Sequence, residues 1–127
     1  MSIDNKFQKY LEQKRDLYNS LLTYIDDESK NVDYFHEFTD LINFENIKEN
    51  TSELQLFIHL LIEISCNRHR NVGFFEKITN IFLYLETDIK LRFSNMDIFE
   101  LCQKSKIILL FLINKNIISV DSNIAMS

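Results

Sequence analysis

One helix with its own start signal is encoded in residues 50–66, NTSELQLFIHLLIEISC. Asn50 offers a side-chain acceptor, and Glu53 follows three residues later at the spacing of a helix cap. Apolar residues then recur every three or four positions, as on one face of a helix: Leu54, Phe57, Ile58, Leu61 and Ile62. Because Leu60 and Ile64 widen this apolar arc, we predict that the helix is buried on more than one side, at the centre of the fold.

Helical spacing continues on both sides of this stretch. Apolar residues predict one long first helix over residues 3–26 and a second helix over residues 32–42. The pattern then weakens, so residues 43–50 are predicted to be a polar linker. After the central helix, residues 67–71 are the clearest predicted loop, and a further helix follows over residues 74–85.

The last third of the chain predicts two shorter helices. A short turn is predicted over residues 89–93, and Ser94 then provides a cap signal for a helix that ends near Cys102. Ser105 opens the last helix. Residues 107–113, IILLFLI, also have the composition of a buried strand, but no other strand is predicted to pair with them. A helix is therefore favoured.

The composition predicts an all-α fold. The 127 residues contain no Pro and one Gly, the two residues that most disfavour a helix. With 46% hydrophobic and 26% charged residues, the chain has the composition of a globular domain. We predict stacked antiparallel helix pairs, five to seven helices in all, as a short α-solenoid or ankyrin-like bundle. A single helical domain would cover residues 1–120, followed by a polar tail over residues 121–127.

Charge and hydropathy restrict the partners. The net charge of −5 at pH 7 and the pI near 5.1 disfavour nucleic acid or an anionic membrane. The longest apolar run, residues 107–113, is far shorter than the roughly 20 residues that span a bilayer. Cys66 and Cys102 lie in apolar helical patterns, as is typical of free cysteines in a reducing compartment. We therefore predict a cytoplasmic protein with no nucleic-acid or membrane partner.

Three strings of the sequence carry a family resemblance: ELQLFIHLLIEIS, NRHRNVGFFEKI and DIKLRFSNMDIFELCQKSKIILLFLI. They resemble the helical region, a domain of unknown function, that precedes ankyrin repeats in many protist proteins. The resemblance covers roughly residues 45–120, and its most specific part is His69–Arg70 followed by Phe74–Phe75. It departs at Arg68, where a second His is common in the family, and at Val72–Gly73, where a Pro is common.

This resemblance implies a scaffold function. A member would be a non-catalytic lead-in to an ankyrin-type repeat array, with no catalytic residues and no cofactor. The relatives continue into ankyrin units where this sequence ends at Ser127, so the resemblance also raises the expectation of a truncated repeat protein. Residues 97–114 themselves look like an ankyrin-type helix pair without its β-turn loop.

Patterns for metal binding and catalysis are weak. Cys66 and His69 have the two-residue gap common among zinc ligands, and His59 or Cys102 could extend the set. No second paired-ligand motif accompanies them, so a core cysteine beside a loop histidine is favoured and no metal is predicted. One Gly cannot build a nucleotide-binding loop, and neither cysteine has the basic neighbours that lower a thiol pKa. We predict no enzymatic activity and no cofactor.

The first candidate binding element is the basic cluster Arg68, His69 and Arg70. Such a cluster suits a phosphate group or an acidic peptide, and the start of the following helix would add a favourable dipole. A charged run of this kind is also typical of a solvated loop.

The second candidate is the C-terminal face, residues 107–118. We predict that Phe111, Ile117 and Ile118 on this face bind a further repeat, another protein or a second copy of the chain, because open ends of helical stacks expose apolar surface. The alternative is a small regulatory protein that binds a peptide or helix in a groove between its own helices. A scaffold should have its open face at the C-terminal pair, whereas a groove binder should have a concave apolar cleft elsewhere.

Overall fold

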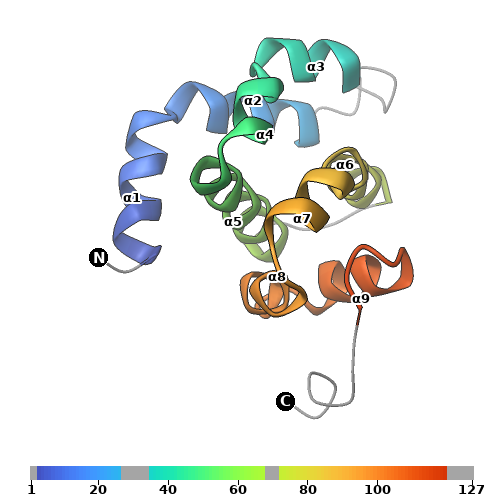
Figure 1. Ribbon diagram of the computed structural model, residues 1–127. Coiled ribbons are helices and arrows are strands. Elements are labelled where there is room, and N and C mark those ends of the chain that lie inside the picture. The colour runs from blue at the N-terminus through green and yellow to red at the C-terminus, as the bar shows by residue number, and fades with distance from the viewer. Residues whose placement is uncertain (1–2, 27–34, 68–71, 120–127) are drawn as a thin grey trace.

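The computed structural model describes residues 3–26, 35–67 and 72–119. Within these ranges it contains helices and no strand (Figure 1). The helices are α1 (Ile3–Gln13), α2 (Arg15–Asp26), α3 (Phe35–Leu41), α4 (Phe44–Glu49), α5 (Thr51–Asn67), α6 (Val72–Tyr84), α7 (Glu86–Arg92), α8 (Asn95–Cys102) and α9 (Lys106–Asn114). The predicted all-α class is confirmed. The nine helices in the described ranges exceed the five to seven that the sequence predicted.

The helices stack in three layers (Figure 1). α2 and α4 form the first layer, α5 and α6 the second, and α8 and α9 the third. α4 contacts α5 and α2 contacts α6, and in the same way α5 contacts α8 and α6 contacts α9. α1 lies against α5, α3 packs on α2 and α4, and α7 follows α6. The predicted stacking of helices is confirmed. Each helix of the second layer contacts one helix of the third, as α5 does with α8 and α6 does with α9.

α5 is the central helix, as predicted. It contacts α1, α4 and α8, so helices surround it on several sides. Its broad apolar arc is buried accordingly, and Leu60, Leu61 and Ile62 are all inaccessible to solvent. The predicted start signal is present, because the Asn50 Oδ1 accepts a hydrogen bond of 3.0 Å from the Glu53 backbone N–H.

The other two predicted starts also have side-chain caps. The Ser94 hydroxyl accepts a 3.1 Å bond from the Asp97 N–H, and the Asp97 carboxylate accepts a 3.1 Å bond from the Ser94 N–H. This reciprocal pair is a complete capping box and fixes the start of α8. At α9 the Ser105 hydroxyl accepts a 3.4 Å bond from the Ile108 N–H. Residues 107–113 are thus helical, and the strand alternative is excluded.

Aromatic rings fill the core between the first two layers. The Tyr24 and Phe38 rings stack with their centroids 4.5 Å apart. The Phe44 ring contacts Phe57 and Tyr84 edge-on at 5.2 and 5.1 Å. These contacts join α2, α3, α4, α5 and α6, so rings occupy the space that a chain with one Ala cannot close by bringing its helices nearer.

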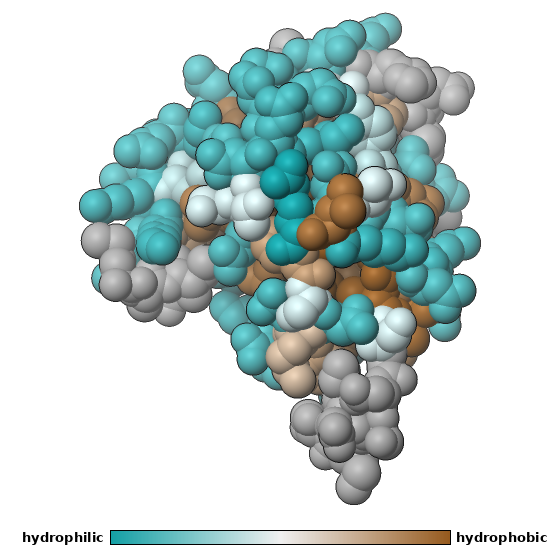
Figure 2. Space-filling model, viewed as in Figure 1, coloured by the Kyte–Doolittle hydropathy of each residue, from teal (hydrophilic) through white to brown (hydrophobic). Residues whose placement is uncertain are grey.

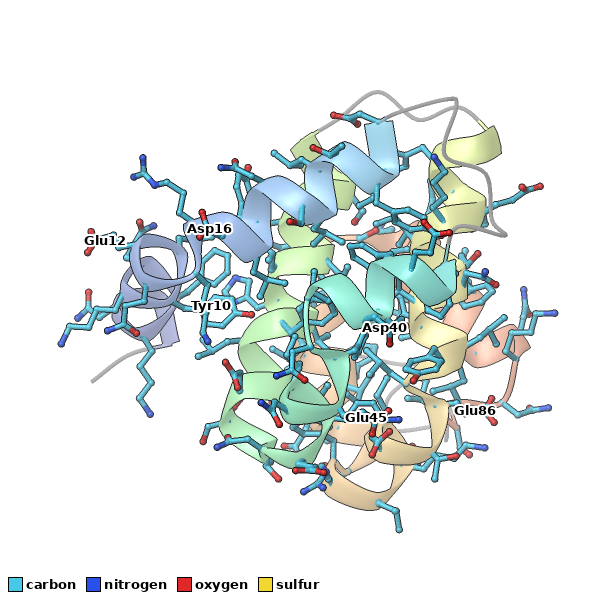
Figure 3. All side chains as sticks on the ribbon, turned by 90° about the horizontal axis from the view of Figure 1, so that it is seen from above. Tyr10, Glu12, Asp16, Asp40, Glu45 and Glu86 are labelled. Carbon is cyan, nitrogen blue, oxygen red and sulfur yellow. The ribbon has the colours of Figure 1, made fainter. Side chains whose placement is uncertain are left out.

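The predicted long first helix is wrong in one respect, because it bends at Lys14. α1 ends at Gln13 and α2 begins at Arg15, although the backbone bonds Lys14 N–H to Tyr10 and Tyr18 N–H to Lys14 continue across the junction at 2.8 and 2.9 Å. Residues 12–16 are all exposed, so no apolar side chain holds this turn against the core. Figure 3 shows Tyr10 pointing toward the body of the molecule and Glu12 pointing away from it. The bend lets α1 cover α5 while α2 covers α6.

Two other connections are helical where the sequence predicted a linker and a turn. Residues 43–50 contain α4, whose Phe44 and Ile47 are buried. Residues 86–92 form α7, whose Ile89 is buried next to Leu85 one turn earlier. In each case two apolar residues three or four positions apart are sufficient to hold a short helix. The neighbouring layer supplies the apolar surface on which these two residues pack.

Candidate functional site

α9 has an apolar face that no described residue covers. Within its sequence, KIILLFLIN, residues 107–113 are apolar on all sides of the helix, but α6 and α8 cover only one side. Ile108 and Leu112 are buried on that side. On the other side Ile107 is 50% exposed and Leu110 is 59% exposed. Figure 2 shows apolar side chains interrupting the polar surface over the part of the molecule built from the later helices. A helix with this composition normally packs on both sides.

Phe111 lies at the edge of this face. Its ring meets the ring of Phe75 on α6 edge-on, with the centroids 6.2 Å apart, and it is half-buried. Phe111 therefore belongs to the contact between the second and third layers, and part of its surface stays exposed.

Ile117 and Ile118 do not form an open surface, and the structure corrects their assignment to one. They are 3% and 4% exposed and belong to the core. After α9, Asn116 takes the left-handed conformation with φ 59°, and its N–H bonds to the Ile113 carbonyl at 3.0 Å. The Ile117 N–H bonds to the Leu112 carbonyl at 2.9 Å. This is a Schellman motif, which folds the residue after the turn back onto the last turns of the helix.

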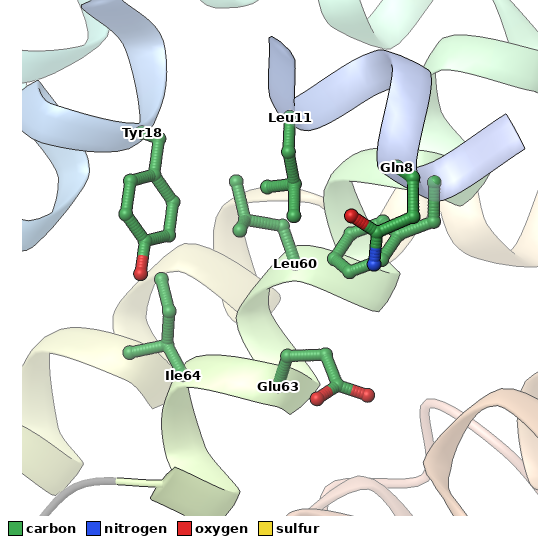
Figure 4. A pocket seen from close by; sticks show the side chains of 7 residues that line it. Gln8, Leu11, Tyr18, Leu60, Glu63 and Ile64 are labelled. Atoms are coloured by element: carbon green, nitrogen blue, oxygen red, sulfur yellow. The ribbon is translucent and has the colours of Figure 1, made fainter. Parts of the chain in front are cut away.

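A second feature is a hollow between α1, α2 and α5, with a volume of about 220 Å³ (Figure 4). Leu60 and Ile64 of α5 form its buried floor, and Leu11 and Tyr18 stand over it from α1 and α2. Phe7, Gln8 and Glu63 complete the lining. The hollow lies on the concave side of the bend at Lys14 and is large enough for one apolar side chain.

Charged and aromatic groups border this hollow on one side. The Glu63 carboxylate accepts a 2.9 Å bond from the Lys104 Nζ and lies 3.3 Å from the His59 Nε2. Burial alone would raise the pKa of Glu63, but the hydrogen bond and charge of Lys104, together with His59, lower it. The Phe7 ring stacks on the His59 ring at 4.0 Å. The Cys66 thiol donates to the Lys104 carbonyl at 3.3 Å, so α1, α5 and the segment after α8 are linked.

His59 therefore contacts Phe7 and Glu63, and the Cys66 thiol bonds to the Lys104 carbonyl. These contacts do not form a metal site. Among the described residues no group of three potential metal ligands is found, and His69 lies outside them. The Cys102 thiol is fully buried, and burial raises its pKa to about 12. It therefore stays protonated and is a poor nucleophile at neutral pH.

The basic cluster Arg68, His69 and Arg70 lies outside the described residues. Its prediction as a binding element stays a prediction.

No family model, curated protein or solved structure matches this chain. The resemblance to the region before ankyrin repeats therefore stays a prediction as well. In the part of the chain that the structure describes, no helix is both long and apolar enough to cross a membrane.

The sequence predicted a candidate binding face on the C-terminal helix but did not indicate which of its residues are most exposed. Ile107 and Leu110 were not singled out, because an entirely apolar run has no periodicity to show which side is buried. One signal was available. Asn114 lies on the same stripe of the helix as Ile107 and Leu110, and a polar residue on an otherwise apolar helix indicates the side that faces water.

Proposed function

We propose that the protein is a non-catalytic interaction module that receives a further helix pair on its α8–α9 layer, as a lead-in to an ankyrin-type repeat array would. The observation that carries this proposal is the exposed Ile107–Leu110 face of α9 at the end of a regular stack. In a stacked helical protein each layer buries one face of the layer before it, and the last layer keeps an open face.

The contacts between layers support the placement of a further helix pair beyond α8 and α9. α8 packs on α5 and α9 packs on α6, so the second layer is covered by the third in two matching contacts. Phe75 and Phe111 meet where α9 covers α6. A further pair placed on α8 and α9 in the same way would cover Ile107 and Leu110. Burying their exposed halves would contribute about 2 kcal/mol to association.

An NMR titration tests the proposal. The protein is labelled with nitrogen-15 and titrated with a consensus ankyrin-repeat protein that lacks its N-terminal cap and so presents an open repeat face. We expect chemical-shift changes on α9 and the outer side of α8, and their loss in Ile107→Lys/Leu110→Lys. Leu91→Lys is the matched control, because Leu91 on α7 is 78% exposed and lies outside the α8–α9 layer. No change on α9, or an equal loss in the Leu91 variant, would contradict the proposal.

The hollow between α1, α2 and α5 favours a second candidate, a regulatory protein that binds a peptide or helix in a groove. In that case an apolar side chain of the partner would enter between Leu11 and Tyr18. The same labelled protein distinguishes the two candidates when it is titrated with an amphipathic peptide. Shifts centred on Leu11, Leu60 and Ile64, abolished by Leu11→Glu, would support the groove.

A further inference from the structure

The segment that contains α9 is basic within an acidic protein. From Gln103 to Ser119 the chain has three lysines, Lys104, Lys106 and Lys115, and no acidic residue, although the whole chain has a net charge of −5. Lys104 is paired with Glu63 at 2.9 Å. Lys106 and Lys115 are exposed, and neither forms an ion pair with another described residue.

These two lysines border the apolar face on opposite sides. Successive residues of a helix are rotated by about 100°, so Ile107, Leu110 and Asn114 share one stripe of α9. Lys106 lies about 100° from Ile107 on one side of the stripe, and Lys115 about 80° away on the other. The exposed surface of α9 is thus a stripe between two cations, with Ile107 and Leu110 as its apolar part and Asn114 at its C-terminal end.

We infer that this face binds an amphipathic helix whose apolar stripe is bordered by Asp or Glu residues. Carboxylates at both edges of the partner's stripe would meet Lys106 and Lys115 when the two apolar stripes pack together. This inference rests on the proposed function, because it names the chemistry of the helix that α9 receives.

The same charges disfavour a second copy of the chain as the partner. In a two-fold dimer the same face of both subunits meets itself. Two α9 helices packed by their Ile107–Leu110 stripes would bring the lysines of one copy near those of the other. Like charges across an interface oppose association. Complementary charges favour it, by about 0.2 to 1 kcal/mol for each exposed pair.

Two synthetic helical peptides test the inference. Both carry the same Leu–Ile stripe, and they differ only in having Glu or Lys at the edges of that stripe. Each is titrated into the labelled full-length protein at low salt. We expect the Glu-edged peptide to shift α9 resonances and to bind about three- to tenfold more tightly than the Lys-edged peptide. Raising the salt concentration to 0.5 M should reduce this preference.

Charge-reversal variants provide the control. In Lys106→Glu/Lys115→Glu the preference should invert, so that the Lys-edged peptide binds more tightly. Lys6→Glu/Lys9→Glu makes the same change of charge on exposed positions of α1 and should leave the preference unchanged. Circular dichroism of each variant checks that the helical content is retained.

The outcomes separate this inference from the proposed function. Equal binding of both peptides on α9 would overturn the acidic partner and leave the α9 face as a docking surface. Binding of neither peptide, with the uncapped ankyrin array still bound on α9, would also overturn only the acidic helix. Concentration-dependent shifts of α9 without any peptide would show self-association and contradict the charge argument. Loss of every interaction on α9, the ankyrin array included, would overturn both.

Discussion

The Lys77 Nζ donates a 2.7 Å hydrogen bond to the backbone carbonyl of Tyr24, in the last turn of α2. Lys77 lies on α6 and is buried, and its ammonium also lies 5.2 Å from the centroid of the Tyr24 ring. A cation at the C-terminal end of a helix meets the negative end of the helix dipole, and its N–H groups can donate to the carbonyls of the last turn. This contact fastens α2 to α6 and so joins the first layer to the second.

Lys77→Met should therefore destabilise the protein. The substitution keeps most of the side-chain volume but removes the donor, and we expect the free energy of unfolding to fall by about 2 kcal/mol. Urea unfolding followed by circular dichroism measures it. Lys90→Met is the control, because Lys90 is exposed and pairs with Glu86 only at 3.8 Å. Equal losses in the two variants would show that the contact of Lys77 with Tyr24 does not contribute more to the free energy of unfolding than an exposed ion pair does.

Asn116 should discriminate between Ala and Gly. Its φ of 59° is unfavourable for a residue with a Cβ, except for Asn and Asp, and is free of strain for Gly. We expect Asn116→Ala to lower the free energy of unfolding by about 1 kcal/mol and Asn116→Gly to leave it nearly unchanged. Thermal unfolding of both variants checks this. If Ala and Gly behaved alike, the turn that buries Ile117 would not depend on the left-handed residue.

Tyr10→Phe should stabilise the protein or leave its stability unchanged. The Tyr10 hydroxyl is buried and has no hydrogen-bond partner among the described residues, and burial with the nearby charge of Glu53 raises its pKa. Removing an unpaired buried hydroxyl relieves a desolvation cost, so we expect a gain of up to about 1 kcal/mol in urea unfolding. Tyr84→Phe is the contrast, because the Tyr84 hydroxyl donates to Glu45 at 3.2 Å. A clear loss of stability in Tyr10→Phe would reveal a partner for the hydroxyl.

Glu63 should make stability depend on acid pH. Lys104 and His59 outweigh burial and lower the pKa of Glu63 in the folded protein. The unfolded chain then binds a proton more readily than the folded one, so the contribution of Glu63 is complete above its ordinary pKa of about 4.3. That contribution is lost as the pH falls through the lower pKa of the folded state.

Unfolding measured at pH 7 and pH 3 tests this dependence. Glu63→Gln should be less stable than the wild type at pH 7, and the difference should shrink toward pH 3. Glu49→Gln, at an exposed position of α4, serves as the reference. A difference that stays constant from pH 7 to pH 3 would argue against the ion pair with Lys104.

The central helix and the helix starts could be predicted because their signals are local. Asn50, Ser94 and Ser105 each cap a helix through a side chain within three residues, and α5 has enough apolar residues to define its own face. The bend at Lys14 and the helices α4 and α7 depend on the neighbouring layers. No local pattern distinguishes two apolar residues in a linker from two in a short helix that packs on α5 or α6.

The exposed residues of the candidate binding surface were predicted only in part, for a similar reason. Ile117 looks like the continuation of an apolar helix, and its burial depends on one left-handed residue, Asn116. The hollow between α1, α2 and α5 exists because the first helix bends, which the sequence did not indicate. Ile107 and Leu110 are exposed because no described layer follows the third one. The residues of a helix pair do not indicate whether another layer packs on them.

The affinity of the uncapped ankyrin array for the α9 face tests the central claim most directly. Isothermal titration calorimetry compares the wild type, Ile107→Lys/Leu110→Lys and Leu91→Lys. We expect the double substitution on α9 to weaken binding at least about tenfold and the α7 substitution to change it less than about twofold. Undiminished binding by the α9 variant would contradict the account, since it would place the docking surface elsewhere on the molecule.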